Sequence, residues 1–118
     1  MRVIDNFLSD EELYIVKNTI LSDNFPLFWN DKVLNQTGDA PQLYYLTHKL
    51  FDTPQGSNSL DYNKIYPIFE KKMEVKALRR MKVNVYPHSY KLYEHGYHYD
   101  QQYSHKGALF SLNTCDGY

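Results

Sequence analysis

The chain has 118 residues, of which 42% are hydrophobic and 23% charged, a composition typical of one globular domain and unlike that of disordered proteins. Its formal net charge of −1 argues against nucleic-acid or membrane-surface binding, and no apolar run approaches the roughly 20 residues that span a bilayer. The one cysteine, Cys115, excludes an internal disulfide, and no apolar leader follows Met1. We therefore expect a single cytoplasmic domain over residues 1–118.

The first predicted element is a helix from Asp10 to about Ser22. Ser9 and Glu12 have the capping-box spacing, and apolar residues then recur at helical intervals. Residues 23–42 are rich in Asn, Asp, Gly and Pro, which predicts a loop with room for one strand. The short apolar stretch 43–50 allows either a strand or a helix, and residues 52–59 are predicted to form a loop.

A second helix is predicted from Leu60 to about Val75, with Pro67 marking either its start or a kink. Hydrophobic residues then alternate with polar ones across 78–86, and the same period of two recurs at 97–100 and 108–113. This order predicts an α+β fold with a helical part over about 1–75 and an antiparallel β part over about 77–118.

The candidate metal ligands are His98 and Asp100, in the triplet His98-Tyr99-Asp100. On a strand, side chains two residues apart project from the same face. One imidazole and one carboxylate are two of the three protein ligands that hold non-haem Fe(II) while leaving coordination positions open. A surface polar pair is the plain alternative. A zinc site is another, built from residues that crowd the same region: His88, His95, His98, His105 and Cys115.

The sequence around this triplet resembles the prolyl 4-hydroxylase-like branch of the Fe(II)- and 2-oxoglutarate-dependent oxygenases. The segment 80–87, in which the predicted strand 78–86 ends at Tyr86-Pro87, comes before the triplet, and a Leu112-Asn113 element followed by Asp116-Gly117-Tyr118 comes after it. The opening segment 3–12 is also similar to the start of that family. The order and spacing of these motifs, which cover both ends of the chain, carry the resemblance.

The resemblance implies a fold, a set of site residues and a reaction, which would couple the oxidative decarboxylation of 2-oxoglutarate to succinate with hydroxylation of a C–H bond. The fold would be helices packed on an incomplete double-stranded β-helix, the jelly-roll or cupin-like core. His98 and Asp100 would bind Fe(II), and no further catalytic residue is assigned. Tyr86 would bind 2-oxoglutarate, with Asn84 and Lys82 lining the same pocket. Ser111 falls where several relatives carry a tyrosine that binds this cosubstrate.

The family's second iron-binding histidine and its 2-oxoglutarate-binding arginine lie downstream of the Asp-Gly-Tyr turn, beyond Tyr118. We therefore expect this chain to be the N-terminal portion of the fold, inactive by itself and weak in Fe(II) binding. Sheet edges left without partners would favour a homo-oligomer. The alternatives are a non-catalytic scaffold or protein-interaction module, and a zinc-stabilised binding domain. The substrate class, a protein side chain or a small molecule, stays open.

Overall fold

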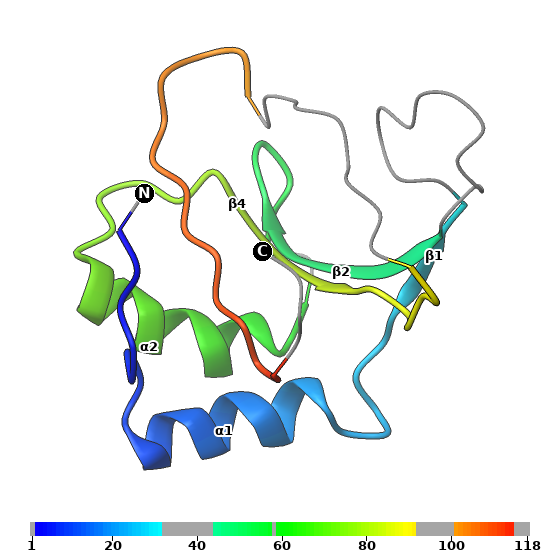
Figure 1. The fold of residues 1–118 in the computed structure, drawn as a ribbon. Helices are drawn as coiled ribbons and strands as arrows, with labels where there is room; N and C mark the ends of the chain where they lie inside the picture. Colours follow the sequence, from blue (N-terminus) through cyan, green and yellow to red (C-terminus); the bar gives the residue numbers. More distant parts are fainter. Residues whose placement is uncertain (1, 32–43, 58, 92–100, 115–118) are drawn as a thin grey trace. The chain divides into compact units, whose positions relative to one another are not determined.

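A computed structural model describes residues 2–31, 44–57, 59–91 and 101–114 (Figure 1). The fold class is α+β, with two helices and a small antiparallel sheet, as predicted. In chain order, the elements are α1 (Asp10–Ile20), β1 (Phe28–Asn30), β2 (Tyr45–Asp52), β3 (Gly56–Ser57), α2 (Tyr62–Met73) and β4 (Arg80–Val85). Neither described helix has the length and apolar character that crossing a membrane requires.

The chain divides into two compact units. Unit 1 consists of Met1–Phe28 with Thr47–Asn84, and unit 2 consists of Trp29–Leu46 with Val85–Tyr118. The buried hydrophobic side chains of the described residues all belong to unit 1. They are Leu8, Val16, Ile20, Phe25, Leu50 and Ile65. Unit 1 therefore contains the hydrophobic core of the described chain.

Helix α1 forms as its capping residues predict. The Glu12 backbone N–H donates to Ser9 Oγ at 3.3 Å, and the Ser9 backbone N–H donates to Glu12 Oε2 at 2.8 Å. This reciprocal pair satisfies two N–H groups that have no partner inside the helix. Val16 and Ile20 are buried one helical turn apart, whereas Leu21 is exposed. The buried stripe of the helix therefore ends at Ile20, which is also the last residue of α1.

The stretch that allowed either a strand or a helix is the strand β2, which pairs with each of the other three strands. His48 and Leu50 are buried, and Lys49 between them is exposed, which is the period of a strand. The loop predicted at 52–59 contains β3, which pairs antiparallel with the end of β2. Gly56 has φ +83°, a left-handed conformation in which glycine avoids the steric clash of a Cβ.

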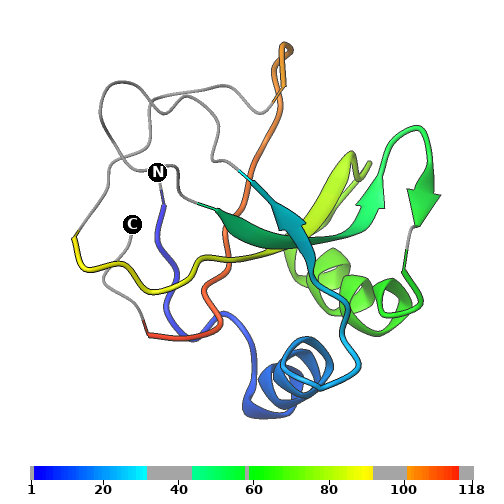
Figure 2. The same ribbon diagram turned by 90° about the vertical axis from the view of Figure 1, so that its right-hand side faces the viewer.

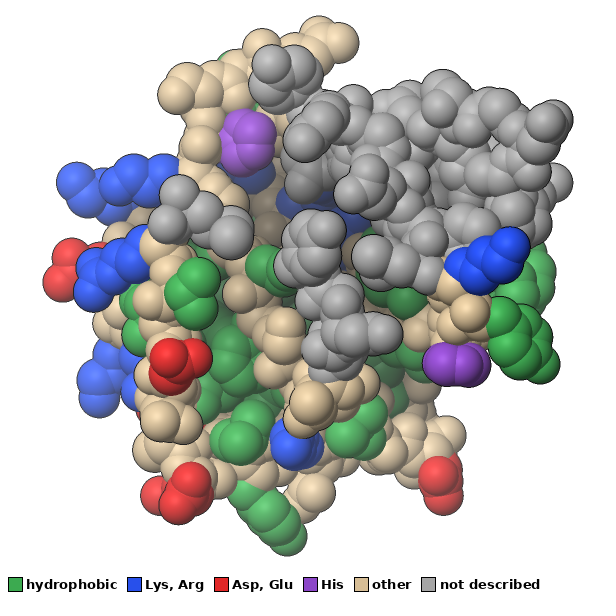
Figure 3. Space-filling model, viewed as in Figure 1, with side chains coloured by type: hydrophobic (Ala, Val, Ile, Leu, Met, Phe, Trp, Pro, Cys, Tyr) green, Lys and Arg blue, Asp and Glu red, His purple; other side chains and the backbone are tan. Residues whose placement is uncertain are grey.

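Helix α2 begins at Tyr62, so the option that it starts near Pro67 is wrong. Pro67 removes one backbone donor inside the helix. The helix is held by side-chain packing instead, since Ile65 is buried and the ring of Tyr62 stacks on that of Tyr66 at 4.9 Å. Basic residues in its last turn complement the negative end of the helix dipole. Basic side chains gather at this end of the helix, at the left edge of Figure 3.

The two helices run antiparallel, side by side (Figures 1 and 2). At one end, Lys72 Nζ of α2 lies 2.8 Å from Glu12 Oε2 of α1 and donates to the Phe7 carbonyl at 3.0 Å. The Phe7 ring stacks on Phe69, with centroids 6.3 Å apart. These contacts attach the N-terminal segment and the start of α1 to the end of α2.

The β part differs from the prediction in two respects. Strand β4 lies where it was expected, but 108–113 is not a strand, because the described residues 101–114 form no backbone ladder. Its side chains still alternate, with Phe110 and Leu112 half-buried and Ser111 exposed. Strand structure needs a hydrogen-bonded neighbour, which alternation alone does not supply. In addition, β1, β2 and β3 come between α1 and α2 in the chain, within the part over about 1–75 that was expected to be helical, although β1 and β2 fall where the prediction left room for strands. The predicted strand 97–100 lies outside the described residues.

The buried position of Leu50 yields a stability prediction. Leu50 is 0% exposed, whereas Leu60 is 89% exposed, so the same leucine-to-alanine change tests burial alone. We expect Leu50→Ala to lower the free energy of unfolding by about 2–5 kcal/mol. Leu60→Ala should change it by less than about 0.5 kcal/mol. Urea denaturation followed by circular dichroism measures both, and equal losses would contradict the described core.

The Glu12 carboxylate yields a pH prediction. The Lys72 ammonium, and after it the Ser9 backbone N–H, lowers the pKa of Glu12 below its ordinary value of 4.5. A carboxyl whose pKa is lowered by folding stabilises the fold fully above its unfolded pKa and loses that effect as pH falls through the folded value. Glu12→Gln should therefore lower Tm at pH 7 and have progressively less effect below pH 4.5.

The control for this effect is Lys72→Met, which removes the largest cause of the shift in the pKa of Glu12. In that background, Glu12→Gln should change Tm much less at pH 7. A Glu12→Gln effect that stays constant from neutral to acidic pH would contradict the assignment.

Candidate functional site on β2 and β4

Asn84, predicted to line a cosubstrate pocket, lies half-buried on β4 and contacts Thr47 on β2. Thr47 Oγ1 lies 2.9 Å from the Val83 carbonyl oxygen and 2.8 Å from Asn84 Oδ1. The Thr47 hydroxyl has one hydrogen, which it can donate to only one of these two oxygens. Both contacts become hydrogen bonds if the Asn84 amide is flipped, that is, if its nitrogen and oxygen exchange places so that the NH₂ group faces Thr47. Thr47 then donates to the Val83 carbonyl and accepts from the Asn84 NH₂ group. The Asn84 side chain is thus oriented by a residue of the neighbouring strand.

Tyr86, the predicted 2-oxoglutarate ligand, follows directly after β4 and stacks on Tyr45 of β2. The ring centroids are 5.4 Å apart and the rings are inclined by 20°. Offset stacking of this kind contributes about 0.5–1.5 kcal/mol beyond area burial and restricts the ring to one orientation. Tyr86 remains 56% exposed. Its side chain is therefore oriented by the stack and accessible to a ligand.

The two contacts belong to different units. Asn84 and its partner Thr47 lie in unit 1, whereas Tyr86 and its partner Tyr45 lie in unit 2. Lys82 precedes Asn84 by two residues on β4, so these two side chains share a face of that strand, and Lys82 is exposed.

The buried histidine His48 has a structural role. It is 4% exposed, and its Nδ1 lies 2.6 Å from the Pro26 carbonyl oxygen. A carbonyl only accepts, so Nδ1 carries the hydrogen and donates it. The imidazole stacks on Phe25 at 4.5 Å and is tilted against Phe28 at 6.0 Å. His48 thus packs as an aromatic ring whose buried N–H group has a backbone partner.

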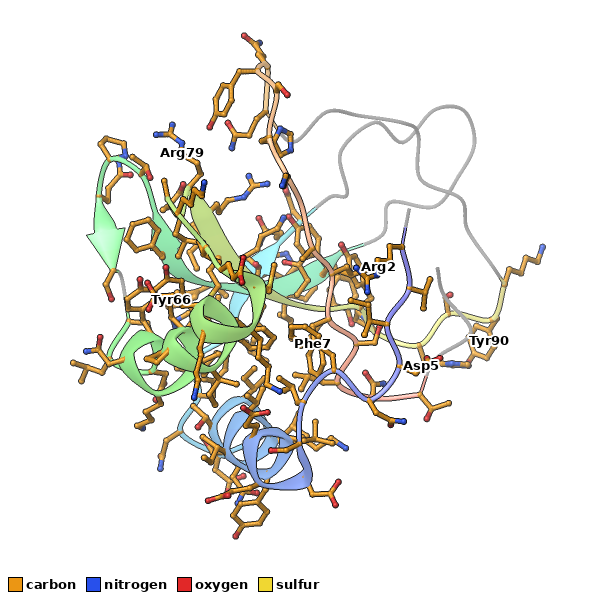
Figure 4. The ribbon with its side chains drawn as sticks, turned by 90° about the vertical axis from the view of Figure 1, so that its left-hand side faces the viewer. Arg2, Asp5, Phe7, Tyr66, Arg79 and Tyr90 are labelled. Atoms are coloured by element: carbon orange, nitrogen blue, oxygen red, sulfur yellow. The ribbon has the colours of Figure 1, made fainter. Side chains whose placement is uncertain are left out.

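The most perturbed acid in the described chain is the phenol of Tyr66, on α2 (Figure 4). Burial, and after it the hydrogen bond to Glu70, raises the pKa of Tyr66 to about 12. The phenol donates to Glu70 Oε1 at 2.9 Å. Its ring belongs to a stack with Phe51 and Tyr62 that joins α2 to β2. This tyrosine therefore stays protonated at neutral pH and contributes to packing.

The predicted metal ligands His98 and Asp100 lie outside the described residues, as do His95 and Cys115. Of the other histidines in the zinc hypothesis, His88 lies edge-on to Tyr90, and His105 Nδ1 lies 2.9 Å from the Tyr103 carbonyl. Within the described ranges, no group of three or more His, Cys, Asp or Glu side chains could hold a metal ion. The iron and zinc sites both stay predictions. Ser111 is exposed.

The sequence interpretation did not single out Tyr45 and Thr47, which orient the two predicted cosubstrate residues. A pattern for them is present: Tyr45, Thr47 and Lys49 alternate with Leu46, His48 and Leu50. The stretch is too short for this alternation to distinguish a strand from a helix by itself, and the pairing with β4 was not known from the sequence.

No protein-family model, curated protein or solved structure matches this chain. The resemblance to the oxygenases therefore stays a prediction from the motifs in the sequence.

The Thr47 hydroxyl can be removed without a change of shape. Thr47→Val should destabilise the fold by about 1–3 kcal/mol, because it leaves the part-buried Val83 carbonyl or the Asn84 amide without its partner. Thr47→Ser keeps the hydroxyl and should recover most of that loss. Urea denaturation gives the energies, and the NMR shift of the Asn84 side-chain NH₂ reports the contact directly. An unchanged Asn84 signal in Thr47→Val would contradict the flipped amide.

Proposed function

We propose that this protein is an Fe(II)- and 2-oxoglutarate-dependent oxygenase of the prolyl-hydroxylase-like kind, which hydroxylates a C–H bond of a protein side chain or a small molecule. The supporting observation is the β2–β4 strand pair. Asn84 and Tyr86, two residues with predicted cosubstrate roles, each contact β2 and are oriented by it.

In this proposal, His98 and Asp100 would hold the iron. An imidazole nitrogen and a carboxylate oxygen are two of the three protein ligands that ferrous iron takes in such sites, so this pair fits the metal as part of the triad. Iron and 2-oxoglutarate, when bound, supply the oxidation: O₂ gives one oxygen atom to the C–H bond and one to succinate, with release of CO₂.

The chain's own groups bind and orient the cosubstrate. The Tyr86 phenol donates a hydrogen bond to a carboxylate of 2-oxoglutarate, and the stack on Tyr45 restricts where that donor points. The Asn84 amide, oriented by Thr47, gives a second polar contact. Donors held in place before the ligand arrives lose less side-chain entropy on binding.

The proposed fold is a double-stranded β-helix, of which β2 and β4 form part. Among the described strands, β4 pairs with β2, and the proposed β-helix would add a further strand to this sheet. A second copy of the chain could supply that strand, which is the basis of the proposed homo-oligomer. The proposed location is the cytoplasm, where a lone cysteine stays reduced.

A second candidate function is a non-catalytic protein-interaction module. Trp29 and Tyr44 stack with centroids 4.0 Å apart and are 62% and 40% exposed. Tyr90 is 100% exposed. Exposed tryptophan and tyrosine rings are enriched at protein interfaces, so these residues would supply the contact surface.

Metal binding tests the oxygenase proposal. Anaerobic equilibrium dialysis with Fe(II) should show an affinity that falls at least about ten-fold in His98→Ala and in Asp100→Ala. The matched controls His88→Ala and His105→Ala remove exposed histidines and should leave it unchanged. In the presence of Fe(II), Tyr86→Phe should weaken 2-oxoglutarate binding by roughly ten-fold, with Tyr90→Phe as its control.

The outcomes separate the candidates. Equal Fe(II) affinity in all four histidine and aspartate variants contradicts the oxygenase proposal. Retention of zinc that depends on His88 and His105 as well as His98 favours the zinc-stabilised domain. If Fe(II) and 2-oxoglutarate both fail to bind, and Trp29→Ala abolishes capture of a protein partner, the interaction module is supported instead.

A further inference from the structure

A surface pocket of about 430 Å³ lies where the C-terminal half of α1 meets the start of α2, within unit 1. Its volume falls in the lower part of the range of about 300–1,000 Å³ that is common for small-molecule sites. We propose that this pocket binds a neutral polyhydroxylated molecule of the size of a monosaccharide. The inference is independent of the oxygenase proposal, because it uses none of the same residues.

Two side-chain amides in the pocket are available to a ligand. Asn18 on α1 and Asn24, after that helix, both line the pocket and are exposed. Among the described residues, neither amide has a hydrogen-bond partner. Each offers a donor and an acceptor side by side, which matches two neighbouring hydroxyl groups of a sugar.

Two hydroxyl groups in the lining present acceptors. Thr19 Oγ1 donates its hydrogen to the Ile15 carbonyl at 2.9 Å, and Ser22 Oγ donates to the Thr19 carbonyl at 2.9 Å. With their hydrogens engaged, both oxygens offer lone pairs and no donor. A matching ligand must therefore bring hydrogen-bond donors of its own, as hydroxyl groups do.

The charges in the lining cancel. Lys64 Nζ lies 2.8 Å from Asp61 Oδ1, so the one cation and the one anion among the lining residues form an ion pair. A phosphate or an ammonium ligand would have to break or compete with this pair. A neutral ligand can instead hydrogen-bond to both partners, because Lys64 keeps two donors and Asp61 keeps several acceptor positions.

Apolar surface completes the pocket. Tyr14 is 67% exposed and Ile15 is 40% exposed, and both line it. A pyranose combines hydroxyl groups on its rim with a face of C–H groups, which packs on an aromatic ring. The combination of free amides, acceptor hydroxyls, a neutralised ion pair and an exposed tyrosine thus favours a sugar over an anion or a purely apolar ligand.

NMR titration tests this site directly. Side-chain NH₂ signals of Asn18 and Asn24 are followed while methyl β-D-glucopyranoside, methyl α-D-mannopyranoside and N-acetyl-D-glucosamine are added to the full chain. At least one of these should cause saturable shifts with a dissociation constant on the order of 1–10 mM, as an open site with few contacts predicts. Glucose 6-phosphate and glucosamine, which carry charge, should bind several-fold more weakly.

Matched variants identify the pocket. Asn18→Ala and Asn24→Ala should each weaken binding about five-fold or more, which is the loss of about one hydrogen bond. Asn18→Ala also raises helix propensity, so it should not unfold α1. Asn63→Ala removes an exposed asparagine of α2 outside the pocket and should have no effect.

Three results would overturn the proposal. The first is the lack of a saturable shift with all three neutral sugars up to about 100 mM, well above the expected range. The second is unchanged binding in both asparagine variants. The third is tighter binding of the charged sugars, which would mean that the ion pair opens. A failure of iron binding in the oxygenase test leaves these outcomes unaffected.

Discussion

Strand β2 is the element on which the described structure depends, because every other strand pairs with it. It also contributes to the core of unit 1 through Leu50 and His48. The buried imidazole is tolerated because its N–H group donates to the Pro26 carbonyl, and an unsatisfied buried donor would cost about 1–3 kcal/mol. The other side chains of β2, among them Tyr45 and Thr47, are left to contact the residues proposed to bind the cosubstrate.

Different groups lie at the two ends of the helix pair. Lys72 bridges to the start of α1 through Glu12 and the Phe7 carbonyl, so the capping box and the interhelical ion pair share one carboxylate. At the opposite end, Asp61 and Lys64 help to line the pocket. One end of the pair is therefore closed by charge, and the other end offers hydrogen-bonding groups to a ligand.

The two proposals make different demands on the fold. An oxygenase site needs donors held in a fixed geometry, and the stack of Tyr86 on Tyr45 and the Thr47–Asn84 contact supply such restraint. A weak sugar site needs only a few exposed polar groups beside an aromatic ring, which surface residues of α1 provide.

The sequence by itself determined the local features whose stabilising groups are close in the chain. The Ser9–Glu12 capping box and the alternation that leads into Tyr86 were predictable because each depends on neighbours within a few residues. Tertiary structure decided the rest. It made Tyr45–Asp52 a strand through its pairing with three others, and it formed no strand at 108–113 despite the same alternation. It also placed Asp61 and Lys64 beside Asn18 and Asn24, because only the packing of α1 on α2 brings such distant segments together.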